Sequence, residues 1–204
     1  EGPIGVGKTS LARILATEFQ ARTVFERVEE NPFLPKFYKS RETYAFQNQT
    51  FFLLNRYHQQ LELGQLDLFN QNTVADYLFA KDNIFAALTL SAEELKLYQQ
   101  IYALLNTRVP KPDLVVYLQA RPEVLYKRVK KRDKSYERGL TFEYLAEVAQ
   151  AYNRFFFNYD ETPLLVVNTS DIDFVASSKH LADLIKEINR MGPGTQHYIP
   201  LGSK

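Results

Sequence analysis

The first ten residues, EGPIGVGKTS, carry the pattern with the clearest chemical meaning in this 204-residue chain. Gly2, Gly7, Lys8 and Thr9 match G-x4-GK[ST], the spacing of a phosphate-binding loop. In such a loop, backbone N–H groups surround phosphate oxygens, the lysine reaches the β- and γ-phosphates, and the threonine hydroxyl binds Mg2+. The pattern therefore predicts a nucleoside triphosphate ligand. The residues expected to contact it are Gly2, Pro3, Ile4, Gly5, Val6, Gly7, Lys8, Thr9 and Ser10.

The residues that follow this loop predict a helix. Between Ser10 and Phe19, Leu11, Ile14 and Leu15 recur at helical spacing and place an apolar stripe on one face. A helix N-terminus favours anions, which agrees with phosphate binding, whereas the alternative is an ordinary turn before a solvated helix.

A phosphate-binding loop also follows a buried strand, and without that strand a doubly wound sheet has two unpaired edges. We therefore expect a strand before Glu1.

Two carboxylates are predicted to lie at the same edge of the sheet as the phosphates. Glu26 and Asp76 each end a short apolar run, and ligands of parallel sheets bind beyond the carboxyl ends of the strands. Glu26 can accept a proton from a hydroxyl group, or it can be a plain surface carboxylate. Asp76 can bind Mg2+, directly or through water, or cap the strand end.

A basic segment and one helix face add further candidate groups. The stretch 126–138, YKRVKKRDKSYER, has seven Lys or Arg among thirteen residues and is either a solvated face or a lid over phosphates. In it, Arg128 and Arg132 share a helix face. Gln49, Phe52 and Arg56 share another, which suits stacking on a planar base and bonding to its edge, or else a core-facing stripe.

The elements that must position these groups alternate between short apolar runs and helical periodicity, which is typical of an α/β fold. We predict a P-loop NTPase-like three-layer fold with a five-stranded parallel sheet, counting the strand before Glu1, in one domain spanning residues 1–204. A lid covers about 126–139, and the tail 192–204 is irregular. The predicted strands are Thr23–Glu26, Thr73–Asp76, Leu114–Leu118 and Leu164–Val167. The predicted helices are Lys8–Phe19, Thr43–Leu63, Ala92–Asn106, Pro122–Arg132, Thr141–Asn158 and Phe174–Met191.

Composition excludes several classes of site. The chain has no cysteine, so it has no disulfide, thiolate metal site or cysteine nucleophile, and its three histidines lack metal-ligand spacing. A net charge of +1 does not favour nucleic acid as a partner. No apolar run approaches the length of a membrane span and no signal pattern is visible, so we expect a cytoplasmic protein.

Several motifs in order resemble the deoxynucleoside kinase family, and in particular its bacterial deoxyadenosine/deoxyguanosine kinases. The resemblance runs from Glu1 to about Phe174 through GPIGVGKTS, EENPFLPKFY, FQNQTFFLLNR, ADYLFAKDNIFA, DLVVYLQARPE and the basic lid. It implies transfer of a phosphate from ATP, with Mg2+ held by Thr9 and Asp76, to the 5′-hydroxyl of a deoxynucleoside. The family usually forms homodimers through helices, which we also expect here.

The resemblance assigns a role to each candidate residue. Glu26 matches the general base that acts on the 5′-hydroxyl. The remaining matches are Tyr38 and Glu137 for the 3′-hydroxyl, Gln49 and Phe52 for the base, Arg56 and Asp82 for a charged pair at the end of the base pocket, Arg128 and Arg132 for the phosphate clamp, and Asp173 and Phe174 for the segment beside the donor adenine.

One departure from the family pattern concerns the cation after the third strand. Many members have Glu/Asp-Arg-Ser, whereas this chain has Asp76-Tyr77. Lys81, four residues after Tyr77, is the residue that we expect to supply the cation from the next helical turn.

The base and the enzyme class remain to be distinguished. Arg56 with Asp82 serves purines and cytosine better than thymine, which predicts a purine deoxynucleoside substrate with deoxycytidine as a side activity. A thymidylate-type monophosphate kinase is the nearest alternative, although Tyr77 stands where its phosphate-binding arginine is expected. A second alternative is a nucleotide-binding subunit without catalytic activity. The chain has both Glu26 and Lys8, the base carboxylate and the phosphate-loop lysine, which argues against this alternative.

Overall fold

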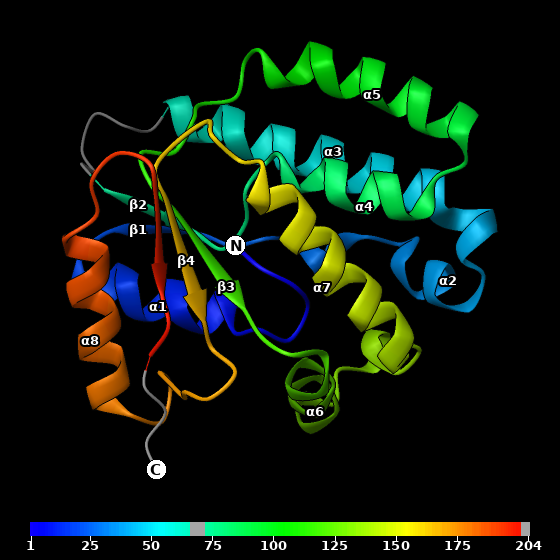
Figure 1. Cartoon of the computed structure of the whole chain (residues 1–204). Helices are drawn as coiled ribbons and strands as arrows, with labels where there is room; N and C mark the ends of the chain where they lie inside the picture. Colours follow the sequence, from blue (N-terminus) through cyan, green and yellow to red (C-terminus); the bar gives the residue numbers. More distant parts are fainter. Residues whose placement is uncertain (66–71, 201–204) are drawn as a thin grey trace.

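A computed structural model describes residues 1–65 and 72–200 of the chain (Figure 1). The helices are α1 Lys8–Glu18, α2 Leu34–Lys39, α3 Arg41–Gln65, α4 Lys81–Thr89, α5 Ala92–Asn106, α6 Pro122–Arg132, α7 Phe142–Phe157 and α8 Ser178–Asn189, with short 3-10 turns η1 Val28–Glu30 and η2 Ser135–Glu137. The strands are β1 Arg22–Val24, β2 Thr73–Ala75, β3 Val115–Gln119, β4 Leu164–Asn168 and β5 Thr195–Tyr198.

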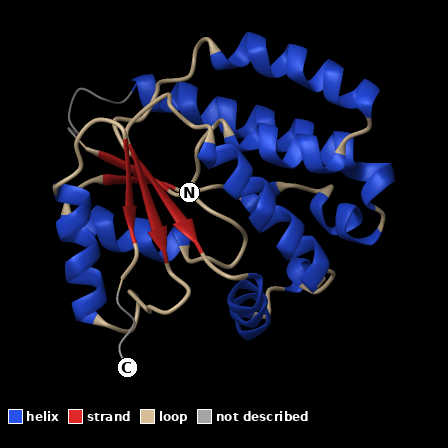
Figure 2. Ribbon diagram, in the orientation of Figure 1, coloured by secondary structure: helices blue, strands red, loops and turns tan. Residues whose placement is uncertain are grey.

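All strand pairs in the described residues are parallel, and helices flank the strands on both sides (Figure 2). β1 pairs with β2 in one sheet, and β3, β4 and β5 form a second in that order. β4 is a run of buried leucines and valines, as expected for a strand covered on both faces. The α/β class with parallel strands is therefore confirmed.

β2 of the first sheet and β3 of the second border a common gap. A cavity of about 560 Å³ lies there, lined by residues of both strands and by the apolar face of α1. Glu1 sits beside β3 in this gap: its N–H group donates to the Val116 carbonyl at 2.7 Å, and the Leu118 N–H donates to the Glu1 carbonyl at 2.8 Å. The described strands thus form a two-stranded and a three-stranded sheet. The five-stranded sheet that we predicted counts a strand before Glu1, and it stays a prediction.

The prediction of an irregular tail over 192–204 is wrong for its described part. Thr195–Tyr198 forms β5, which continues the parallel pairing from β4 with Val166 opposite His197. Its sequence, TQHY, is polar and mostly exposed, so it has neither the alternation nor the apolar run that marks a strand. Pairing with the β4 edge, rather than burial of side chains, defines this strand.

Two helices, α2 and α4, were not predicted. α2 is short, and α4 begins with Lys81 and Asp82, which are buried although they are charged. Buried charges hide the usual apolar periodicity of a helix. None of the described helices is long and apolar enough to cross a membrane.

Candidate active site

The phosphate loop, residues 2–9, needs glycine at two positions for different reasons. Gly7 precedes α1 with φ +107°, a left-handed conformation that L side chains rarely adopt. A Cβ on Gly2 would lie 2.4 Å from the Leu118 carbonyl oxygen, so only glycine lets the loop approach β3 this closely. The loop therefore has the backbone shape that its sequence pattern predicts.

Lys8 and Thr9 place their functional atoms at the mouth of this loop. The Lys8 ammonium donates to the Gly2 carbonyl at 2.7 Å and to the Pro3 carbonyl at 3.2 Å, so it lies across the loop. Burial lowers its pKa to about 8. The Thr9 hydroxyl donates to Oδ2 of Asp76 at 2.5 Å, and Oδ1 of Asp76 accepts the Glu26 N–H at 2.8 Å. The loop and two strand ends thus meet at one point.

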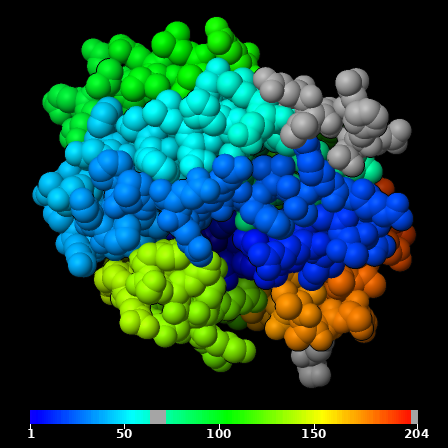
Figure 3. All heavy atoms as spheres, turned by 180° about the vertical axis from the view of Figure 1, so that it is seen from behind, coloured from blue at the N-terminus to red at the C-terminus, as the bar shows by residue number. Residues whose placement is uncertain are grey.

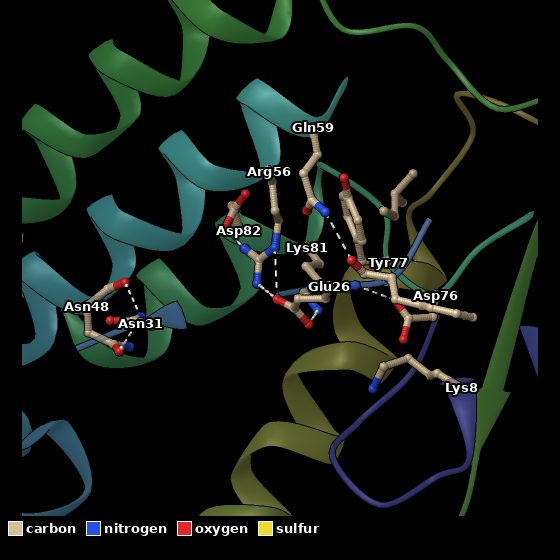
Figure 4. A network of polar contacts seen from close by, with 12 residues as sticks. Lys8, Glu26, Asn31, Asn48, Arg56, Gln59, Asp76, Tyr77, Lys81 and Asp82 are labelled. Atoms are coloured by element: carbon tan, nitrogen blue, oxygen red, sulfur yellow. Dashed lines mark hydrogen bonds and ion pairs between the residues drawn. The ribbon is translucent and has the colours of Figure 1, made fainter. Parts of the chain in front are cut away.

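Glu26 is held between two cations. Lys81 Nζ donates to its Oε2 at 2.6 Å, and Arg56 Nε donates to its Oε1 at 3.0 Å, with Nη2 bonded to the same oxygen (Figure 4). Burial opposes ionisation of the carboxyl, but the charges of Arg56 and Lys81 outweigh it and hold the pKa of Glu26 well below its ordinary value. Lys81 thus places a cation directly beside the Glu26 carboxylate.

Arg56 also binds Asp82 through Nη1, so one guanidinium joins two carboxylates. Arg56 stacks over the Phe52 ring, with its central carbon 4.9 Å from the ring centroid. Asp82 is fully buried behind Arg56 and does not line the cavity beside the phosphate loop, whereas Arg56 does. In this structure Asp82 therefore acts through Arg56 rather than as a wall of the pocket.

A second cavity, of about 460 Å³, begins at the phosphate loop and extends to α3; because it holds the candidate residues, it is called the main cavity below. In Figure 3 the surface is hollowed between the N-terminal residues, in blue, and the lid, in yellow-green. The candidate residues that line it are Ile4, Gly5, Lys8, Thr9, Glu26, Tyr38, Gln49, Phe52, Arg56, Asp76, Lys81, Arg132 and Glu137. The structure thus gathers side chains from distant parts of the sequence around one space.

Gln49 and Tyr38 are both oriented by neighbours. Gln49 donates through Nε2 to the Thr89 hydroxyl at 3.1 Å, which fixes its side-chain amide at the cavity wall. Burial raises the pKa of the Tyr38 hydroxyl well above its ordinary value, so this group remains a hydrogen-bond donor. Tyr38 also packs against Gly139, where a Cβ would lie 3.1 Å from the Tyr38 Cβ, and this contact joins α2 to the lid.

The lid arginines have different partners. Arg132 lines the cavity and forms an ion pair with Glu137, with Nε 3.0 Å from Oε2. Arg128 instead donates to backbone oxygens of Val6 at 3.3 Å and of Thr169 at 2.9 Å. Arg128 thereby ties the phosphate loop to the segment after β4.

The segment after β4 meets the phosphate loop through Phe174. The Phe174 ring is buried, and its nearest atom is 3.0 Å from the place where a Cβ on Gly7 would lie. The Asp173 carboxylate accepts the Val175 and Ala176 N–H groups, both at 2.9 Å, and so forms the turn before α8. Phe174 thus lies at the phosphate loop and Asp173 is engaged in local structure, while contact of this segment with a donor adenine stays a prediction.

Sequence reasoning missed three groups that shape this site. Asn31 donates to the Asn48 side chain at 3.0 Å and fixes the loop after Glu26 on α3. Glu1 accepts hydrogen bonds from the Leu78 N–H at 2.7 Å and the Tyr152 hydroxyl at 3.0 Å. The signal for Asn31 was its place before proline in EENPF, where an Asn side chain often forms a turn. Glu1 and Tyr152 gave no comparable signal.

The Thr9 and Asp76 oxygens fit a magnesium ion by chemistry. Mg2+ prefers hydroxyl, carboxylate and phosphate oxygens and uses one or two protein ligands together with substrate phosphates. A hydroxyl and a carboxylate in direct contact beside the phosphate loop supply these donors. No cluster of three or more His, Cys, Asp or Glu suited to a metal occurs in the described part of the chain.

Comparisons with known proteins identify the family. The deoxynucleoside kinase family model matches residues 1–191. The chain is 38% identical over 175 residues to a deoxyguanosine kinase of Bacillus subtilis (strain 168), covering 85% of this chain and 84% of that protein. It is 30% identical over 204 residues to a deoxyadenosine kinase of Lactobacillus acidophilus, covering 92% of each.

The fold is also that of solved structures of this family. The structure of deoxyadenosine kinase from M. mycoides with products dCMP and a flexible dCDP bound superimposes with a TM-score of 0.80 at 24% identity, covering 93% of this chain and 96% of that one. A second structure of that kinase, with bound dATP, gives a TM-score of 0.79 at 23% identity. At this identity the likeness supports the fold, while the family model and the sequence relatives carry the assignment. With a phosphate loop, a buried carboxylate beside it and this ancestry, the chain belongs to the deoxynucleoside kinase family.

Proposed function

We propose that this kinase transfers the γ-phosphate of ATP to the 5′-hydroxyl of a purine deoxynucleoside. The observation that carries the proposal is Glu26, which lies in the main cavity next to the phosphate loop and is paired with Lys81 and Arg56. A carboxylate at this place can accept the hydroxyl proton of an acceptor whose base extends towards α3. The relatives named deoxyguanosine and deoxyadenosine kinases support a purine acceptor.

In the proposed reaction, Glu26 takes the proton from the 5′-hydroxyl. The hydroxyl oxygen forms a bond to the γ-phosphorus while the bond from that phosphorus to the bridging oxygen breaks, and ADP leaves with the electron pair. Lys8 stabilises the phosphate charge, and Lys81 orients the Glu26 carboxylate. Mg2+, when bound through Thr9 and Asp76, would neutralise phosphate charge.

The sugar and base are assigned to opposite walls of the main cavity. Tyr38 and Glu137, joined through the contact of α2 with the lid, are proposed to bind the 3′-hydroxyl. Gln49 and Arg56 are proposed to bond the base edge while Phe52 contacts its face. A guanidinium donates to ring nitrogens and carbonyl groups, which purines offer. Arg132 is proposed to close on the phosphates.

The experiment that tests this function measures phosphorylation of the four natural deoxynucleosides and of dTMP with Mg-ATP. Deoxyguanosine or deoxyadenosine should be the preferred acceptor, and Glu26→Gln should abolish turnover. Turnover of dTMP alone would replace the proposal with a monophosphate kinase. ATP binding without turnover of any acceptor would instead support a non-catalytic subunit.

We also propose a homodimer formed through helices. On α5 the side chains of Leu97 and Leu104 are 49% and 74% exposed, and α5 lies on the outside of the molecule next to α3 (Figure 1). Two copies related by a twofold axis would cover this apolar surface. Light scattering should give twice the monomer mass, and Leu104→Glu should shift the protein to the monomer.

A further inference from the structure

Arg56 joins the two parts of the site that have different tasks, namely the carboxylate that acts on the hydroxyl and the wall that faces the base. All three of its guanidinium nitrogens are used: Nε and Nη2 donate to Oε1 of Glu26, and Nη1 donates to Oδ1 of Asp82. Its side chain is 4% exposed, so these bonds are shielded from water. Figure 4 shows Arg56 reaching from α3 between the two carboxylates.

This arrangement opposes the action of Glu26 as a base. With Lys81 on Oε2 and Arg56 on Oε1, both carboxylate oxygens are bonded to cations. A carboxylate that is stabilised by two cations has little tendency to take a proton. Oε1 accepts two hydrogen bonds, both from Arg56, so it is open to a substrate hydroxyl only when Arg56 moves, whereas Oε2 accepts one from Lys81.

Arg56 has a second carboxylate oxygen within its surroundings that it can bind. Oδ2 of Asp82 is buried and accepts no hydrogen bond from the residues that the structure describes. The Tyr98 hydroxyl on α5 is likewise buried and unpartnered. An unpaired carboxylate oxygen in such surroundings is unfavourable, and a guanidinium can satisfy both oxygens of one carboxylate at once. The side of the site away from Glu26 can thus hold Arg56 more fully.

We infer that Arg56 makes phosphoryl transfer conditional on the nucleobase: in the arrangement seen here it occupies Glu26, and a purine that offers acceptor atoms draws it towards Asp82 and frees Oε1 for the 5′-hydroxyl. The inference rests on the proposed function. Arg56 gives up two bonds to Glu26 and gains one to Oδ2 of Asp82 and one to the base, so the number of bonds is conserved. Specificity and catalysis are then coupled through one side chain.

The test uses an acceptor without a base. The full chain and its Arg56→Met variant are assayed with Mg-ATP on deoxyguanosine and on 1,2-dideoxyribose, and the phosphorylated sugar is measured directly. Arg56→Met should lower kcat/KM for deoxyguanosine but raise it at least tenfold for the base-free sugar, because Glu26 is no longer occupied. Unchanged or lower turnover of the base-free sugar would overturn the inference, since loss of a base contact alone cannot raise it.

Two further variants complete the test. Gln49→Met removes a proposed base contact without touching Glu26 and should give no increase with the base-free sugar. Arg56→Met/Asp82→Asn avoids an unpaired buried charge and should show the same increase if the single variant does not fold. Asp82→Asn alone weakens the second place for Arg56 and should lower kcat for deoxyguanosine; an unchanged kcat would contradict the inference.

The two hypotheses fail in different ways. If the unmodified chain phosphorylates no deoxynucleoside, the proposed function is wrong. If it phosphorylates deoxyguanosine but Arg56→Met brings no gain with the base-free sugar, the function stands and only the conditional role of Arg56 is wrong.

Discussion

Lys81 is the residue whose removal tests the site most directly. Its ammonium is 2.6 Å from Oε2 of Glu26 and its side chain is 4% exposed, so Lys81→Met deletes a shielded charge beside the carboxylate that we propose as the base. Removing one preorganised group that stabilises charge in a transition state costs about 3 kcal/mol, which corresponds to a roughly 100-fold lower kcat. The KM for ATP should change little, because the phosphate loop keeps Lys8.

The assay is steady-state phosphorylation of deoxyguanosine under saturating Mg-ATP. Lys111→Met is a matched control, because Lys111 also pairs with a glutamate but is 66% exposed, and it should leave kcat unchanged. Lys81→Arg should restore part of the activity by keeping the charge. A folded Lys81→Met enzyme with near-normal kcat would refute the argument that Lys81 replaces the arginine of other family members.

Three further predictions follow from other parts of the site. Glu26→Gln should lower kcat by about 10²- to 10⁴-fold while ATP still binds, as measured by calorimetry, and a smaller loss would exclude general-base action. Gly7→Ala should destabilise the fold by about 1–2 kcal/mol in urea unfolding and raise the KM for ATP, because alanine must take φ +107° against the Phe174 ring. With a Lys8 pKa of about 8, kcat/KM for ATP should fall about tenfold per pH unit above that value. In the unfolded chain Lys8 keeps its proton up to its ordinary pKa of 10.5. Lys8 should therefore make the free energy of unfolding rise with pH between about pH 8 and 10.5. Urea unfolding at several pH values in this range would check the direction of the change.

The sequence predicted the site better than it predicted the sheet. Strand ends followed by a carboxylate placed Glu26 and Asp76 together, because parallel strands bring their carboxyl ends to the same edge. The pairing of β5 could not be predicted in this way, because a polar strand such as Thr195–Tyr198 carries no periodic signal of its partner.

Buried charges were the second obstacle to prediction. Lys81 and Asp82 form the charged first turn of α4, before its apolar residues Ile84, Phe85 and Leu88, and they pair with Glu26 and Arg56 from other elements. Such residues look like a surface segment in the sequence. The family resemblance pointed to Asp82, and the departure from the family pattern at Tyr77 pointed to Lys81, where hydrophobic periodicity pointed to neither.

The two lid arginines show why spacing alone does not define a role. Arg128 and Arg132 are four residues apart on α6, so the sequence placed both on one face towards the phosphates. Arg128, however, is surrounded by backbone carbonyls of the phosphate loop and of the segment after β4, and burial lowers its pKa. Arg132 stands at the helix end, where it reaches Glu137 across the cavity wall. Arg128 is therefore suited to hold the phosphate loop in shape, while Arg132 keeps a charge that a bound phosphate can take over from Glu137.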